Sequence, residues 1–129
     1  MLVDTSEGKY QVGERWHYRT RVGEEDSLLT VLKVESSQEF GVIVHVSLDG
    51  LRVENRRAPG RVSETIGHMP FAEAAIDESV TTRAATGVSV AADNGGYDEW
   101  RRAWDAGRAG VFTISVAEGV DLLAPALSP

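Results

Sequence analysis

The sequence predicts a single α+β domain over residues 1–129, in which two or three helices cover a bent antiparallel meander sheet. Three observations predict it. Side chains alternate between apolar and polar in the first half, polar turns divide that half into short segments, and helical spacing appears after residue 70. A partly open barrel is an alternative form of the same sheet. Residues 1–9 and 125–129 are expected to be frayed.

The first expected strand covers residues 14–22 and has two different faces. Its even-numbered side chains from Trp16 onward are predicted to point inward, and its odd-numbered side chains, all Arg or His, toward water. A second strand over residues 27–35 and a third over about residues 40–48 follow after polar turns. These three segments begin the meander.

The Asp49-Gly50 pair, flanked by alternating apolar residues, is a strong short-range sign of a two-residue hairpin. We therefore expect a fourth strand over residues 51–55, paired with the third. The register places His45 opposite Glu54 on the polar face, where such a pair contributes about 0.2–1 kcal/mol. The other expected pairs are Leu48 with Leu51, Val46 with Val53, and Ser47 with Arg52. The expected pairing with Glu54 favours a structural role for His45 over acid–base chemistry.

The second half predicts a long loop and then helices. Residues 55–69 have no clear period, which predicts an irregular segment that is either functional or mobile. Pro70 fits the first turn of a helix that reaches about Arg83. A second helix over 97–106 and a returning strand at 111–114 follow. Ser115 then opens a last helix, which Pro125 closes.

Three aromatic residues, Tyr97, Trp100 and Trp104, fall on one stripe of the second expected helix. A row at this spacing is expected to pack on the sheet. The alternative is an exposed stripe that anchors a protein interface, where Trp and Tyr dominate binding energy.

Composition excludes several classes of function. The formal net charge of −7 disfavours nucleic-acid binding, and the absence of cysteine excludes disulfides, thiolate metal sites and cysteine nucleophiles. No apolar run reaches the length of a membrane span, and the N-terminus lacks the pattern of a secretion signal. The expectation is a cytoplasmic protein with no membrane partner.

Motifs for catalysis or cofactor binding are missing. His17, His45 and His68 have none of the close spacings of metal ligands, and no nucleophile elbow, phosphate loop or dinucleotide fingerprint is present. We predict no catalytic residue, no metal and no cofactor. An enzyme is the less favoured reading, although distant residues can assemble a site on any fold.

Arginine is concentrated in two segments that we expect to lie close together. Its planar guanidinium suits carboxylates and phosphates. The ordinary alternative is a solvated sheet face balanced by nearby glutamates. The predicted partner-binding residues are Arg15, His17, Arg19, Arg21, Arg52, Arg56, Arg57 and Arg61.

Three stretches carry a resemblance: Val12-Gly13 through Trp16-x-Tyr18-x-Thr20-Arg21, Gly67-His68-Met69-Pro70-Phe71, and Gly96-Tyr97-Asp98-Glu99-Trp100 through Gly110-Val111-Phe112-Thr113. Together they resemble a group of small, single-domain bacterial proteins of uncharacterised function. The resemblance implies a bacterial cytoplasmic protein and implies no activity, cofactor or catalytic residue.

The first hypothesis from sequence is a non-enzymatic module that binds another protein through the arginines and the 55–69 loop. An immunity-like inhibitor of a bacterial toxin is one version, by analogy of size and charge. The alternative is a small-molecule sensor or enzyme with a pocket between sheet and helices. Nucleic-acid binding comes third, and a homodimer is compatible with each.

Overall fold

The computed structural model describes residues 2–90 and 95–127, and its main sheet is antiparallel with the order β7-β4-β3-β2-β8. A short strand, β1, pairs with β3 beyond the end of β2, and β5 and β6 form a separate two-stranded sheet. The strands are β1 (Val3–Asp4), β2 (Arg15–Tyr18), β3 (Leu28–Ser37), β4 (Gly41–Leu48), β5 (Val53–Glu54), β6 (Val62–Ser63), β7 (Ile66–Ala72) and β8 (Val80–Ala85). The helices are α1 (Glu73–Ser79), α2 (Gly95–Asp105), α3 (Val116–Leu127) and the 3₁₀ turn η1 (Pro59–Arg61).

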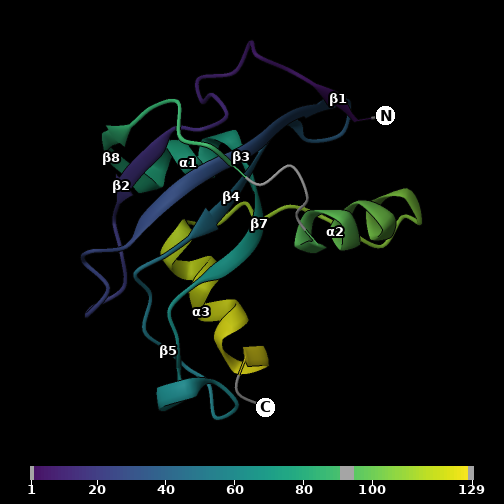
Figure 1. The fold of residues 1–129 in the computed structure, drawn as a ribbon. Coiled ribbons are helices and arrows are strands. Elements are labelled where there is room, and N and C mark those ends of the chain that lie inside the picture. Colours follow the sequence, from purple (N-terminus) through teal and green to yellow (C-terminus); the bar gives the residue numbers. More distant parts are fainter. Residues whose placement is uncertain (1, 91–94, 128–129) are drawn as a thin grey trace.

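The predicted α+β architecture is confirmed, and the sheet is not closed into a barrel. Helices α1 and α3 pack together on one face, and α2 stands apart from them (Figure 1). Within the described residues, no helix has the length and apolar character needed to span a membrane.

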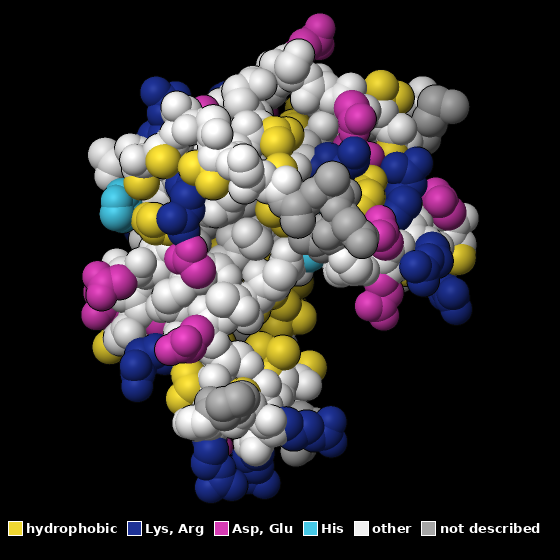
Figure 2. All heavy atoms as spheres, in the orientation of Figure 1, with side chains coloured by type: hydrophobic (Ala, Val, Ile, Leu, Met, Phe, Trp, Pro, Cys, Tyr) yellow, Lys and Arg dark blue, Asp and Glu magenta, His cyan; other side chains and the backbone are white. Residues whose placement is uncertain are grey.

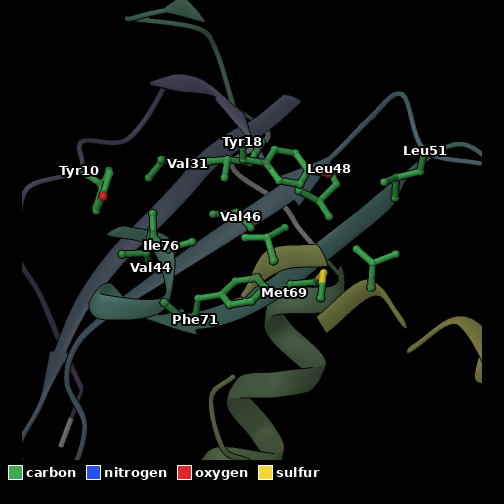
Figure 3. Close-up of a cluster of buried hydrophobic side chains, with 14 of the residues drawn as sticks. Tyr10, Tyr18, Val31, Val44, Val46, Leu48, Leu51, Met69, Phe71 and Ile76 are labelled. Atoms are coloured by element: carbon green, nitrogen blue, oxygen red, sulfur yellow. The ribbon is translucent and has the colours of Figure 1, made fainter. Parts of the chain in front are cut away.

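The core lies between the sheet and the α1–α3 layer (Figure 3). Leu29, Val31, Val44, Val46 and Phe71 project into it and are fully buried. Full burial of one such side chain contributes about 1.5–3 kcal/mol. This layer covers one face of the sheet and holds the strands in place. We call the opposite face of the sheet the platform.

Helix α3 lies close against β7 because it carries glycine at the contact. A Cβ built on Gly119 meets the Met69 Cε at 3.0 Å and the Phe71 Cζ at 3.3 Å. The predicted capping box also forms: the Glu118 backbone N–H donates to Ser115 Oγ at 3.2 Å. Pro125 was expected to close this helix but lies inside its last turn.

A β-bulge in β3 decides which side chains face the platform. Val31 pairs with Val46, but the next pair is Lys33 with His45, so Leu32 is an extra residue. One inserted residue reverses the alternation of the strand. Glu35 therefore faces away from the core, although it shares odd numbering with Leu29 and Val31, which face into it.

The predicted Asp49-Gly50 hairpin is wrong. Strand β4 ends at Leu48, and β5 pairs with β6 instead of returning along β4. The Asp49 carboxylate pairs with Arg15 and accepts the Leu28 backbone N–H, which fixes it toward β2 and β3. The chain then leaves the sheet, and the Leu51 N–H donates to the Glu64 carbonyl at 2.9 Å.

Two further predictions are wrong in the region from residue 66 to residue 85. Residues 66–72 were expected to be loop and helix, yet they form β7, an edge strand beside β4. An edge position tolerates Pro70, which has no N–H to donate. Helix α1 is correspondingly short, and residues 80–83, expected to be its last turn, lie in β8 because β-branched Thr81 and Thr82 favour extended backbone.

The returning strand expected at 111–114 is reduced to one parallel bridge between Phe71 and Phe112. It nevertheless lies at the predicted sheet edge. The Phe112 N–H donates to the Pro70 carbonyl, and the Ala72 N–H donates to the Phe112 carbonyl, both at 2.9 Å. Helix α2 ends near Gly107, as predicted, with Gly107 in the left-handed region at φ 74°.

Candidate functional site

The sheet face opposite the core carries a buried chain of three titratable side chains from three adjacent strands. Glu35 is on β3, His45 on β4 and His68 on β7. His45 lies between Val44 and Val46, which point into the core, so alternation turns it to the other face. His45 is 0% exposed and Glu35 1% exposed, whereas His68 at the sheet edge is half-buried.

The three side chains are joined by two short hydrogen bonds. His45 Nε2 lies 2.8 Å from Glu35 Oε1, and His45 Nδ1 lies 2.8 Å from His68 Nε2. The two imidazole rings are stacked, with their centroids 5.1 Å apart and an interplanar angle of 21°. The result is a continuous path for a proton from the half-buried His68 to the enclosed Glu35.

Helix α2 covers this chain with polar contacts to Glu35. The Tyr97 hydroxyl donates to Glu35 and lies 3.0 Å from each carboxylate oxygen. Arg101 Nη1 donates to Glu35 Oε2 at 3.2 Å and to the Tyr97 hydroxyl oxygen at 3.2 Å. Lys33 Nζ lies 5.3 Å from the centre of the Tyr97 ring. The carboxylate is thus held by groups from both the sheet and the helix.

The aromatic stripe of α2 packs on the sheet, as predicted. The Trp100 ring meets His45 edge-on at 4.8 Å between centroids and lies 6.0 Å from His68. The Trp104 ring lies 5.1 Å from the Trp100 ring, tilted by 32°, and contacts Phe40, which is at the β3–β4 turn. The stripe shields the histidine pair from water, which strengthens the hydrogen bonds beneath it.

These surroundings set the charge of Glu35 and of His68, the two ends of the hydrogen-bonded chain of side chains. Burial acts to raise the pKa of Glu35, but the hydrogen bonds from His45 and Tyr97 and the nearby charge of Lys33 outweigh it and hold that pKa below its ordinary value. Burial lowers the pKa of His68 to about 4. At neutral pH, Glu35 is a carboxylate and His68 a neutral imidazole.

The expected pairing of His45 with Glu54 is therefore wrong. Glu54 lies in β5, on the separate two-stranded sheet, and His45 pairs across the strands with Lys33 and Pro70. The error follows from the predicted Asp49-Gly50 hairpin, because the register of that hairpin placed His45 on the solvent-facing side of the sheet. One signal in the sequence did point to the buried position, namely a lone His within the apolar run Val42 to Val46.

Half of the predicted partner-binding set lies on or just after β2, where most of it already has partners. Arg15 pairs with Asp49 and donates to Thr30 Oγ1, and the Arg19 Nη1 donates to the Glu78 carbonyl at 2.6 Å. Arg21 binds the buried Glu24 through two hydrogen bonds of 2.9 and 3.1 Å. His17 is exposed.

The other four predicted residues, Arg52, Arg56, Arg57 and Arg61, lie around β5, η1 and β6 and are exposed. Figure 2 shows dark-blue side chains gathered at the end of the molecule where Figure 1 places β5. Arg61 is also the one non-glycine residue with positive φ, at 61°, in the described part of the chain. We call these four residues the basic end.

Comparisons with family models, with curated proteins and with solved structures found no match to this chain. In residues 2–90 and 95–127, no group of three or more His, Asp or Glu side chains is arranged to hold a metal ion. The geometry of the Glu35–His45–His68 chain therefore carries the functional argument.

Proposed function

We propose that this protein binds a small polar molecule at His68 and that the Glu35–His45–His68 chain accepts a proton from it. The observation that carries the proposal is the enclosure of Glu35 and His45 in a continuous hydrogen-bonded path that ends at a half-buried imidazole. Removing a carboxylate from water costs several kcal/mol before its partners compensate. Perturbed, buried titratable groups of this kind concentrate at functional sites.

The direction of the path follows from charge. An ionised Glu35 has only acceptor atoms, so His45 Nε2 must donate to it. Arg101 already supplies a positive partner to that carboxylate, and a cationic His45 would add a second positive charge in the enclosed space. We therefore assign a neutral His45, whose Nδ1 accepts the His68 Nε2–H.

This assignment leaves the lone pair of His68 on Nδ1, the ring nitrogen not used within the chain. The group that binds there must be a hydrogen-bond donor, such as a hydroxyl or an amine. When His68 Nδ1 takes a proton, its Nε2–H can shift to His45. The ionised Glu35, whose pKa is held low by its contacts, then stabilises the positive charge through the His45 Nε2–H bond, so that the charge does not remain on a desolvated His68.

The place for the ligand is the β7 edge of the sheet beside α2. His68 lies on this edge strand, next to the exposed Gly67, and Trp100 supplies an apolar surface nearby. The proposal follows the second sequence hypothesis, which expected a small-molecule site between sheet and helices approached through the 55–69 segment.

A ligand screen tests the proposal. Purified protein is heated with a panel of small hydroxylated, amino and carbonyl compounds, and ligand-dependent rises in Tm are recorded. A ligand present at 100 times its Kd adds about 2.7 kcal/mol of stability. We expect the rises to disappear in His68→Gln and to persist in His17→Gln, the matched change at an exposed histidine.

Two results contradict the proposal. One is a panel in which no compound raises Tm in a His68-dependent way. The other is a hit that the His68→Gln protein binds with unchanged affinity, since that ligand would occupy another site.

A further inference from the structure

The basic end differs in charge from the rest of the molecule. Residues 51–66 contain four arginines and two glutamates, whereas the whole chain has a formal net charge of −7. This short segment of an acidic protein therefore carries a local excess of positive charge, which can orient an acidic partner.

A hollow of about 480 Å³ lies beside this segment, between β5 and the C-terminal half of α3. Arg52 and Arg56 line it, and Val53, Ala124 and Pro125 give it an apolar part. Two carboxylates, Glu54 and Asp121, also face it. The hollow thus offers positive, apolar and negative surfaces within the space of a few side chains.

The wall of the hollow is fixed by Arg21. Its guanidinium pairs with Glu24, in the turn after β2, and donates to the Asp121 carboxylate on α3 at 3.0 Å. It also donates to the Arg52 carbonyl at 3.4 Å. Glu24 in turn accepts the Arg52 backbone N–H at 2.7 Å. These contacts of the half-buried Arg21 hold β5 and α3 in one arrangement, so the hollow is preorganised for binding.

We propose that the hollow and the basic end bind an acidic peptide segment of another protein. Carboxylates of the segment pair with Arg52 and Arg56, and an apolar side chain between them packs on Ala124 and Pro125. This surface is separate from His68, so the proposal goes beyond the function proposed above and does not depend on it.

The carboxylates in the hollow favour a peptide over a nucleic acid. A phosphate backbone carries negative charge at close, regular intervals and would bring phosphates against Glu54 and Asp121. A peptide places its carboxylates only where the sequence has them and can present apolar or amide groups to those two side chains. The net charge of −7 acts in the same direction.

The test uses a short fluorescein-labelled peptide of alternating Glu and Leu, with binding followed by fluorescence anisotropy at low salt. Arg52→Glu and Arg56→Glu should each weaken binding by about tenfold or more. Arg102→Glu, an identical charge change on an exposed residue of α2, should leave the affinity nearly unchanged. A second peptide with Ser in place of Leu should bind more weakly, because it lacks apolar contact.

Three results would overturn the inference: no binding of the Glu-Leu peptide, equal weakening by Arg102→Glu, or tighter binding of a labelled single-stranded DNA of the same length. If a charge reversal lowers Tm, Arg52→Gln and Arg56→Gln take its place, with Arg102→Gln as the control. The His68→Gln protein should bind the peptide normally, which separates failure here from failure of the His68 site.

Discussion

Acidification should weaken the fold through His68 in a defined pH range. Burial lowers the pKa of His68 from 6.5 to about 4. Below about pH 6.5 the unfolded chain takes up a proton that the native imidazole does not, so the free energy of unfolding falls as pH falls. The fall ends near the native pKa of about 4. The difference between the two pKa values corresponds to about 3 kcal/mol.

Urea unfolding of the native protein, His68→Gln and His17→Gln at several pH values measures this contribution. The His17→Gln protein should lose stability on acidification as the native protein does. In His68→Gln the loss over this interval should be smaller by about 3 kcal/mol, because glutamine does not titrate. The reasoning is refuted if all three proteins lose the same stability between neutral pH and the native pKa of His68.

Other substitutions test the packing and the polar cluster by the same unfolding measurement. Glu35→Ala leaves the enclosed His45 N–H without its acceptor and should cost about 1–3 kcal/mol, and an unchanged stability would show that the carboxylate is not enclosed. Ser115→Ala removes the cap of α3 and should cost about 1 kcal/mol, whereas no loss would mean the cap is replaced by water. Gly119→Val should cost about 1–3 kcal/mol because its side chain overlaps Met69, and a gain in stability would contradict the close packing of α3 on β7.

Most of the fold follows from local patterns in the sequence. Alternation predicted β2, β3 and β4, helical spacing with Gly107 predicted α2, and the Ser115 capping box predicted the start of α3. Each of these signals depends on residues close together in the chain, where backbone preference and burial agree.

The errors arose where a distant contact outweighed a local preference. Asp49-Gly50 has the composition of a hairpin turn, but the Asp49 side chain is taken by Arg15 and the chain leaves the sheet. Pro70 suits a helix start as well as an edge strand, and only the pairing of β7 with β4 selects the strand. The residues next to Asp49 and Pro70 in the sequence do not indicate these distant partners, Arg15 and strand β4.

The candidate site was hidden for the same reason. The bulge at Leu32 places Glu35 on the same face of the sheet as His45. The residue types around Leu32 do not predict a bulge. His68 lies 23 residues from His45 along the chain, and strand pairing of β7 with β4 brings their rings together. The aromatic stripe was recognised from the sequence, but the polar groups beneath it were not.

The positions of the two imidazole protons test the central claim most directly. Nitrogen-15 NMR of histidine-labelled protein at neutral pH reports which ring nitrogen of each histidine carries hydrogen. We predict protons on Nε2 of both His45 and His68, with the Nδ1 of His68 unprotonated and able to accept a proton from a ligand. A His68 that carries its proton on Nδ1, or on both nitrogens, would contradict the proposed direction of proton transfer.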